Sequence, residues 1–253
     1  MGKVFFISGA TRGIGLQLAT QLSQADSSNT IIATARDPTT STGLNELASK
    51  NKNVYIISLD ISSEESINGI DEQISSLVSN TGIDVYISNG AICESAPISK
   101  LNRQVHIDHY LTNVLGPLQI INILYKYLVK APTKQIFLLS SIAGQVADFV
   151  PIATGAYGQS KAALNHSALQ LSLQYKDEGF TVVPLHPGIV DTSLADNIIK
   201  SLPEDLSELA KAFIAQLISP EESASGIIGN IINKVTVEDS GKFYKFDGTT
   251  LSY

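Results

Sequence analysis

A tyrosine and a lysine, Tyr157 and Lys161, form the one Tyr-x-x-x-Lys pair in the chain. On a helix, this spacing places both side chains on the same face, one turn apart. The ordinary pKa of a phenol is about 10, which is too high for proton transfer at neutral pH. A nearby ammonium favours the phenolate, so we expect Lys161 to lower the pKa of Tyr157 and make it a general acid or base.

A glycine-rich turn near the start of the chain has the composition needed to bind the phosphates of a dinucleotide. Residues 8–16 read SGATRGIGL, between a predicted strand and a predicted helix. Glycines in such a turn let the backbone approach a pyrophosphate, which the helix N-terminus then stabilises. No Gly-Lys-Ser/Thr sequence follows, which argues against a nucleoside-triphosphatase loop. The predicted cofactor-binding residues of this turn are Gly9, Thr11, Arg12, Gly13, Ile14 and Gly15.

The residues after the second predicted strand favour NADP(H) over NAD(H). An acidic residue at this place binds a ribose 2′-hydroxyl, whereas an arginine accommodates a 2′-phosphate. Ala35 occupies the place expected for the acid, and Arg36 follows it. Arg12 of the glycine turn supplies a second cation for the phosphate. Asp37 keeps NAD(H) open as the alternative, because a shift of one residue would bring its carboxylate to the ribose.

Short apolar runs alternate with segments of helical period along the whole chain. Near-continuous Ile, Val and Leu strands between crossover helices predict an α/β fold. We expect one Rossmann-type, doubly wound parallel sheet of about seven strands with helices on both faces, forming a single domain over residues 1–253. The predicted strands are 4–8, 30–34, 54–59, 85–88, 135–140, 182–185 and 242–244. The predicted helices are 14–24, 64–79, 103–129, 154–176, 204–217 and 221–233.

Composition and charge exclude several classes of protein. The net charge is −7 and the lysines are scattered, which argues against nucleic-acid binding and against docking on an anionic membrane. No apolar run reaches the ~18 residues that span a bilayer. A strand is predicted from the third residue, so no signal peptide is expected, and we expect a cytoplasmic protein.

The cysteine and histidine content gives little support to other chemistry. Cys93 is the one cysteine, which excludes an intrachain disulfide. It is either a catalytic thiol or a small apolar filler, and the second is favoured because no triad accompanies it. His106 and His109, with Asp108 between them, superficially suggest a metal site. No further ligand is indicated, so we expect no metal and a solvated helix face here.

Taken together, these motifs resemble the classical short-chain dehydrogenase/reductase family over essentially the full length. Within that family the chain is most similar to fungal carbonyl reductases, in the branch of norsolorinic acid ketoreductase-like and benzil reductase-like enzymes. The similar segments are SGATRGIGL at 8–16, TARDP at 34–38, YGQSKAALN at 157–165 and PGIVDT at 187–192.

The resemblance implies four catalytic residues. Tyr157 would protonate the substrate oxygen, and Lys161 would activate it and hold the nicotinamide ribose. Ser141, in the segment SSIAG, would donate a hydrogen bond to the same oxygen. Asn113 falls where the family's catalytic asparagine kinks the long helix and supports a water relay.

The resemblance also extends the cofactor site beyond the glycine turn. Asp60, followed by Ile61, matches the segment that binds the adenine amine. Asn89 lies in SNGA, which departs from the family's Asn-Asn-Ala-Gly and leaves its role less well defined. The segment over the nicotinamide would supply Pro187, Gly188, Val190 and Thr192.

The function implied is an NADPH-dependent carbonyl reductase with a small-molecule substrate. We expect a hydrophobic or aromatic ketone, diketone or aldehyde, held under a lid near residues 189–217 that begins as a loop. Phe149, Val150 and Pro151 should add apolar wall. The alternatives are an alcohol or steroid dehydrogenase working oxidatively and a non-catalytic NADP-binding sensor. The resemblance also suggests a homodimer or homotetramer, with a monomer left open.

Overall fold

Parallel strands dominate the central sheet, as the apolar runs predict. The computed structural model describes residues 2–78, 81–201 and 207–253. Within them, eight strands pair in the order β10-β9-β6-β5-β4-β1-β2-β3, and each neighbouring pair is parallel except β9 with β10. The strands are β1 (Val4–Ser8), β2 (Thr30–Ala35), β3 (Val54–Ser58), β4 (Val85–Ser88), β5 (Gln135–Leu139), β6 (Thr181–His186), β9 (Phe243–Lys245) and β10 (Thr250–Leu251).

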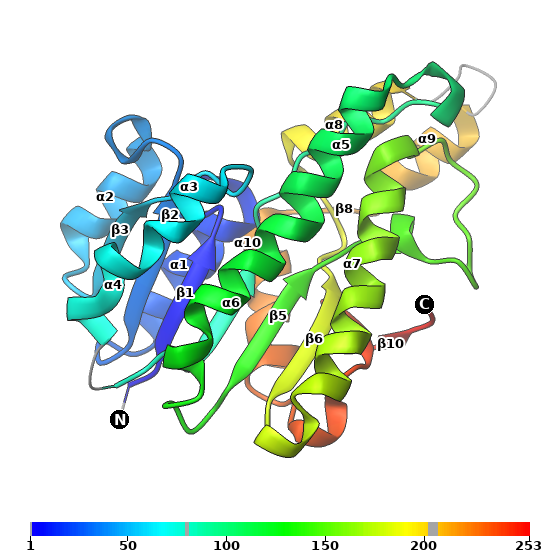
Figure 1. The fold of residues 1–253 in the computed structure, drawn as a ribbon. Helices are drawn as coiled ribbons and strands as arrows, with labels where there is room; N and C mark the ends of the chain where they lie inside the picture. Colours follow the sequence, from blue (N-terminus) through cyan, green and yellow to red (C-terminus); the bar gives the residue numbers. More distant parts are fainter. Residues whose placement is uncertain (1, 79–80, 202–206) are drawn as a thin grey trace.

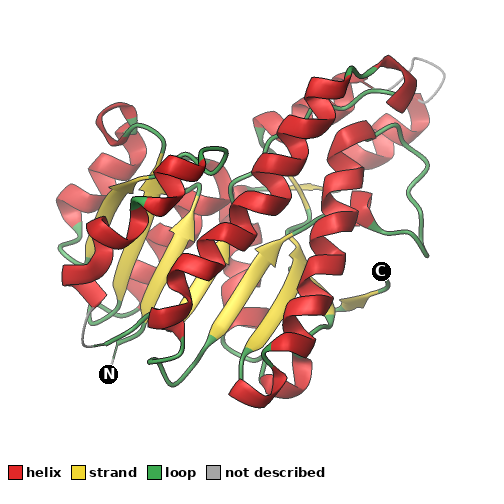
Figure 2. Ribbon diagram, in the orientation of Figure 1, coloured by secondary structure: helices red, strands yellow, loops and turns green. Residues whose placement is uncertain are grey.

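Helices cover both faces of this sheet, which gives the three layers visible in Figures 1 and 2. Alternate residues of β1 point into the two cores: Phe6 packs in one and Ile7 in the other, both fully buried. On the Phe6 face lie α3 (Glu64–Asn68), α4 (Ile70–Val78), α6 (Gly116–Leu128) and α7 (Gly155–Gln174). On the Ile7 face lie α1 (Gly13–Ala25), α2 (Thr42–Lys50), α10 (Pro220–Gly226) and the π-helix η7 (Ile227–Ile232).

The predicted α/β fold is confirmed, and the differences lie at short elements. The eighth strand, β10, is two residues long and antiparallel, too short to give a pattern in the sequence. A separate pair, β7 (Ile189–Val190) and β8 (Leu217–Ile218), was not predicted either. The helix predicted over 64–79 is divided at Gly69 into α3 and α4.

Three helical regions differ from the prediction. Helix α2 was missed because only Leu44 and Leu47 in it are buried apolar residues. The long helix predicted over 103–129 is α5 (Arg103–Tyr110), the π-helix η3 (Leu111–Leu115) and α6 in succession. The predicted loop at the start of the lid contains α8 (Ser193–Ser201), which precedes α9 (Ser207–Ile214). Residues 204–206 of the helix predicted over 204–217 lie outside the described residues.

A short 3-10 turn, η4 (Ile142–Gly144), follows β5 and packs directly on the backbone of α7. A Cβ atom at Gly144 would lie 2.6 Å from the carbonyl carbon of Lys161 and 2.7 Å from the nitrogen of Ala162. Both atoms belong to a helix backbone, which cannot move aside as a side chain can. This close approach fixes Ser141 relative to Tyr157.

Replacing Gly144 by alanine should therefore force η4 away from α7. We expect Gly144→Ala to lower the free energy of unfolding by roughly 1–3 kcal/mol, the usual cost of overpacking. Urea unfolding monitored by circular dichroism measures it. Gly229→Ala is the matched control, because a Cβ there meets nothing within 4 Å. Equal stability of the two variants would contradict the close contact.

Candidate functional site

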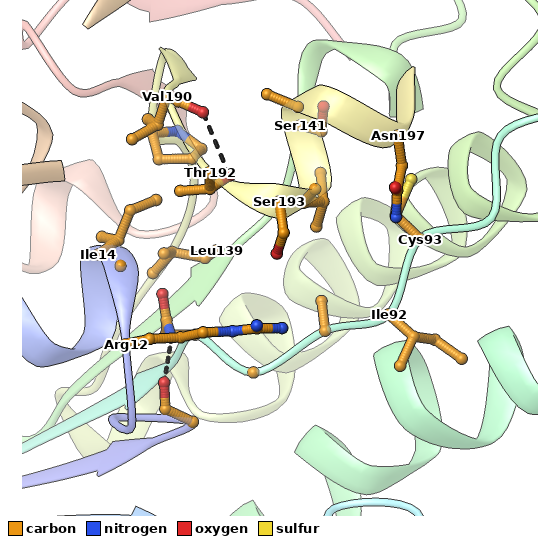
Figure 3. A pocket seen from close by; sticks show the side chains of 18 of the residues that line it. Arg12, Ile14, Ile92, Cys93, Leu139, Ser141, Val190, Thr192, Ser193 and Asn197 are labelled. Atoms are coloured by element: carbon orange, nitrogen blue, oxygen red, sulfur yellow. Dashed lines mark hydrogen bonds between the residues drawn. The ribbon is translucent and has the colours of Figure 1, made fainter. Parts of the chain in front are cut away.

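A cavity of about 1400 Å³ opens at the carboxyl ends of the parallel strands. This is the edge where the strand order reverses, between β1 and β4, and where open α/β sheets bind their ligands. Sixteen of the predicted site residues line it: Gly9, Thr11, Arg12, Gly13, Ile14, Arg36, Asp60, Ile61, Asn89, Ser141, Tyr157, Lys161, Pro187, Gly188, Val190 and Thr192. Figure 3 shows Arg12, Ser141 and Cys93 around this space.

The glycine turn is held in shape by its neighbours. Gly9 has a φ of +72°, its N–H donates to the Thr34 hydroxyl at 3.1 Å, and its carbonyl accepts from the Asn89 amide at 2.6 Å. Gly15 lies behind the turn, where a Cβ would be 2.3 Å from the Gly9 carbonyl oxygen. Helix α1 begins at Gly13 without a side-chain cap, so its N-terminal N–H groups remain available to an anion. Thr34 was not predicted, since a threonine inside a strand carries no distinctive signal.

The positively charged end of the cavity lies beside β2. Arg12 and Arg36 line it, and both are exposed. The carboxylate of Asp37 turns back into its own loop, where it accepts from the Thr39 N–H at 2.9 Å and the Thr39 hydroxyl at 2.6 Å. These hydrogen bonds hold the pKa of Asp37 below its usual value. The Asp37 carboxylate, which kept NAD(H) as an alternative cofactor, is thus bound within its own turn. Strand β2 ends at Ala35, directly before Arg36.

At the other end of the cavity, Tyr157 lies beside Ser141. Tyr157 is 5% exposed and lies in the first turn of α7. Burial raises the pKa of its phenol, and a hydrogen bond with Ser141 lowers it by a smaller amount. The Ser141 oxygen also accepts from the Ala143 N–H at 3.1 Å, which fixes the serine at the start of η4.

The effect expected of Lys161 differs from what the structure shows. The Lys161 ammonium lies 5.7 Å from the centroid of the Tyr157 ring and donates to the Leu139 carbonyl at 2.7 Å. Burial lowers the pKa of Lys161 to about 8. The pKa of Tyr157 is raised rather than lowered, because desolvation dominates and the lysine is itself driven toward its neutral form.

Asn113 lies in the π-helix η3, where the sequence predicted a distortion of the long helix, and it does not line the cavity. Its side chain accepts from the Ile92 N–H and donates to the Ile92 carbonyl, both at 2.9 Å. It also donates to the Ser160 hydroxyl at 2.9 Å, and Ser160 donates to the Tyr157 carbonyl at 2.7 Å. Asn113 therefore links the segment after β4 to the helix turn that carries Tyr157. Its water relay stays a prediction.

The wall of the cavity departs from expectation near the long loop before α7. Val150 lines the cavity and Ile152 lines it too, but Phe149 is 68% exposed and Pro151 is exposed as well. This loop is bound to the last residues of the chain. Gln145 donates to the Ser252 carbonyl at 2.9 Å, and the Ala147 N–H donates to the Tyr253 carbonyl at 2.8 Å.

The segment after β6 covers the cavity from the side of α8. Thr192 donates to the Val190 carbonyl at 3.2 Å (Figure 3), and Ser193 and Asn197 line the space. His186, which precedes this segment, is buried, and its pKa is lowered to about 3 by burial. It therefore stays neutral. Closure of residues 189–217 as a lid stays a prediction.

The comparisons with known proteins agree with this geometry. Residues 3–202 match the family model described as short chain dehydrogenase. The chain belongs to the short chain dehydrogenases. An uncharacterized oxidoreductase of Schizosaccharomyces pombe is 38% identical over 99% of this chain and 98% of its own. The short chain dehydrogenase gsfK of Penicillium aethiopicum is 34% identical over 100% of both chains.

Solved structures resemble this short chain dehydrogenase over its whole length. The NADPH-bound carbonyl reductase from chicken fatty liver has a TM-score of 0.88 and 26% identity, covering 100% of this chain and 94% of that one. The carbonyl reductase Sniffer of Drosophila melanogaster has a TM-score of 0.87 and 24% identity, covering 100% of both. The predicted family and the predicted class, an oxidoreductase acting on CH–OH or C=O groups, are confirmed.

One further finding concerns membranes. Among the helices in the described part of the chain, none combines the length and apolar character needed to cross a bilayer.

The buried lysine should make stability depend on pH in a specific direction. Below about pH 8 the fold must bury a charged Lys161, and between about pH 8 and 10.5 the unfolded chain holds more protons, so stability rises with pH. We expect Lys161→Met to be more stable than the wild type at pH 7 by roughly 1–3 kcal/mol, with the gain fading as the pH rises from about 8 toward 10.5. Urea unfolding between pH 6 and 10 measures it.

Lys176→Met is the control, since Lys176 is exposed at the end of α7. The difference in the free energy of unfolding between Lys176→Met and the wild type should not change over the same pH range. If the difference in the free energy of unfolding between Lys161→Met and the wild type is also independent of pH, Lys161 is not desolvated.

Proposed function

We propose that this short chain dehydrogenase is an NADP(H)-dependent carbonyl reductase. The observation that carries the proposal is one cavity with two chemically distinct ends. A glycine turn with Arg12 and Arg36 lies at one end, and the hydroxyls of Ser141 and Tyr157 lie with Lys161 at the other. The likeness to the NADPH-bound carbonyl reductase supports both the cofactor and the substrate class.

The residues present fit a dinucleotide phosphate. A Cβ at Gly9 would lie 2.5 Å from the Cα of Gly90, so only a glycine lets the turn approach the segment after β4 this closely. The uncapped N–H groups at the start of α1 would hold the phosphates. Arg12 and Arg36 offer guanidinium groups to a 2′-phosphate, and the Asp37 carboxylate is held by Thr39. When bound, NADPH supplies the hydride.

Burial sets the protonation state of the proton donor. The raised pKa of Tyr157 keeps its phenol protonated at neutral pH, which suits a group that donates a proton to a newly formed alkoxide. Ser141 donates to the same oxygen where negative charge develops. The Lys161 ammonium lies 5.7 Å from the centroid of the phenol ring and has a pKa of about 8, so it can return a proton to this site. In the direction of reduction, Tyr157 therefore already holds the proton that the alkoxide needs.

The apolar lining favours a hydrophobic or aromatic ketone, diketone or aldehyde. The wall of the cavity contains apolar side chains from four segments: Ile92, Val150, Ile152, Ile198 and Phe213. A substrate with a carbonyl at one end and an apolar body buries this surface on binding.

Tyr157→Phe should remove the proton donor while leaving the cofactor site intact. We expect kcat for NADPH-dependent ketone reduction to fall by roughly a thousandfold or more. NADPH affinity, measured by fluorescence titration, should change little. Tyr55→Phe, on the partly exposed β3, is the control. Unchanged turnover in Tyr157→Phe would refute the assignment, and a wild type that binds NADPH but reduces no carbonyl in a broad panel would favour a sensor.

Removing either arginine at the adenosine end should weaken NADPH selectively. Because a hydrogen bond to a charged group contributes about 1.5–3 kcal/mol, Arg12→Gln and Arg36→Gln should each raise the KM for NADPH roughly tenfold or more. The KM for NADH should stay within about twofold, since NADH lacks the 2′-phosphate. Arg103→Gln, at the start of α5, is the matched control. Parallel losses for both cofactors would contradict a 2′-phosphate site.

A further inference from the structure

Helix α5 carries a buried histidine whose partner, Glu94, directly follows two residues that line the cavity, Ile92 and Cys93. The sequence predicted a solvated face for His106 and His109. For His109 that prediction is wrong, since it is only 2% exposed. His106 is half-buried and bonds the Gln159 side chain at 2.9 Å. His109 instead contacts the backbone of Glu94, in the segment that follows β4.

The hydrogen bonds of His109 fix which nitrogen carries the proton. Its Nδ1 lies 2.8 Å from the Val105 carbonyl oxygen, which can only accept, so Nδ1 is the protonated nitrogen. Its Nε2 is then an acceptor, and the Glu94 N–H donates to it at 2.9 Å. The ring is held at both nitrogens in its neutral form.

Two more residues bind the same segment. Asn113, one helical turn beyond His109, makes two hydrogen bonds with the backbone of Ile92. The Ser95 hydroxyl, within the segment, donates to the Ala153 carbonyl of the loop before α7 at 2.9 Å. The backbone is therefore held at Ile92 and Glu94, directly on either side of Cys93.

Cys93 is close to the catalytic groups. Cys93 and Ile92 both line the cavity, and Figure 3 shows their side chains at its rim. The Cys93 thiol lies near enough to Tyr157 and Lys161 that a thiolate there would raise the pKa of both. Burial raises the pKa of the thiol to about 12, so it stays protonated and acts as a small apolar wall group.

We propose that His109 is a positioning residue: by accepting the Glu94 N–H it holds Cys93 and Ile92 against the space beside Tyr157, and so limits the size of the carbonyl substrate. This role rests on the proposed function only where substrate size is concerned. Holding Cys93 in place is a property of the fold and can be measured without turnover.

The proposal depends on the nitrogen acceptor rather than on the volume of the ring. A buried N–H without a partner costs about 1–3 kcal/mol, and moving the segment outward restores its hydration. Phenylalanine keeps the ring and lacks the acceptor. Glutamine places an amide oxygen near the position of Nε2 and keeps the acceptor. His109→Phe and His109→Gln therefore form a matched pair.

Because Cys93 is the one cysteine of the chain, its reaction with a thiol reagent reports on this segment alone. We expect 5,5′-dithiobis(2-nitrobenzoate) to label the native His109→Phe protein roughly tenfold faster than the wild type, which corresponds to about 1.4 kcal/mol of easier local opening. His109→Gln should react within about threefold of the wild type. His166→Phe, an exposed histidine on α7, should match the wild type.

The second measurement is substrate selectivity. With NADPH, His109→Phe should raise the ratio of kcat/KM for a bulky aromatic ketone to that for a small aliphatic ketone, mainly through KM, and His109→Gln should restore it. Wild-type labelling and wild-type selectivity in His109→Phe would overturn the proposal. If the wild type reduces no carbonyl, the proposed function fails, and the labelling rates still decide the role of His109. If His109→Phe does not fold, His109→Leu, which also lacks the acceptor, is judged by the same rates.

Discussion

The handedness of the crossovers is the constraint on which the site depends. Right-handed connections send the helices that follow β1 and β4 to opposite faces of the sheet. A crevice must then open between the carboxyl ends of these two strands, whatever side chains lie there. Gly9 and Asn89 lie at its floor, one after the end of each strand, and the Asn89 side-chain amide donates a hydrogen bond to the Gly9 carbonyl across the gap. The ligand-binding residues extend outward from this contact.

Desolvation is the second governing effect, and it explains why the reactive end of the cavity differs from a simple ion pair. Tyr157 and Lys161 are both nearly inaccessible, so burial disfavours the charged form of each. The pKa of the phenol is therefore raised and that of the ammonium is lowered, so burial favours the neutral form of each group. This arrangement lowers the free energy of unfolding, and it holds two proton-exchanging groups in a site that excludes water.

How much could be read from the sequence depended on whether the signal was local. Apolar runs predicted the strands. Short motifs predicted the glycine turn, the two arginines and the pair of Tyr157 with Lys161, because each motif is contiguous in the sequence. Helix α2 was missed because it buries only two leucines. Helix α8 was missed because polar residues interrupt its apolar ones. The burial of His109, the outward turn of Phe149 and the raised pKa of Tyr157 arise from residues distant in sequence, which no local pattern reports.

The loop between Ser141 and Tyr157 is secured by the far end of the chain, through Gln145 with Ser252 and Ala147 with Tyr253. On the ribosome, β1 and its glycine turn emerge early and can begin to pack while synthesis continues. The partners of this loop emerge more than a hundred residues later than the loop itself. The dinucleotide half of the crevice can thus form on a nascent chain, whereas the substrate wall must wait until synthesis has reached Tyr253.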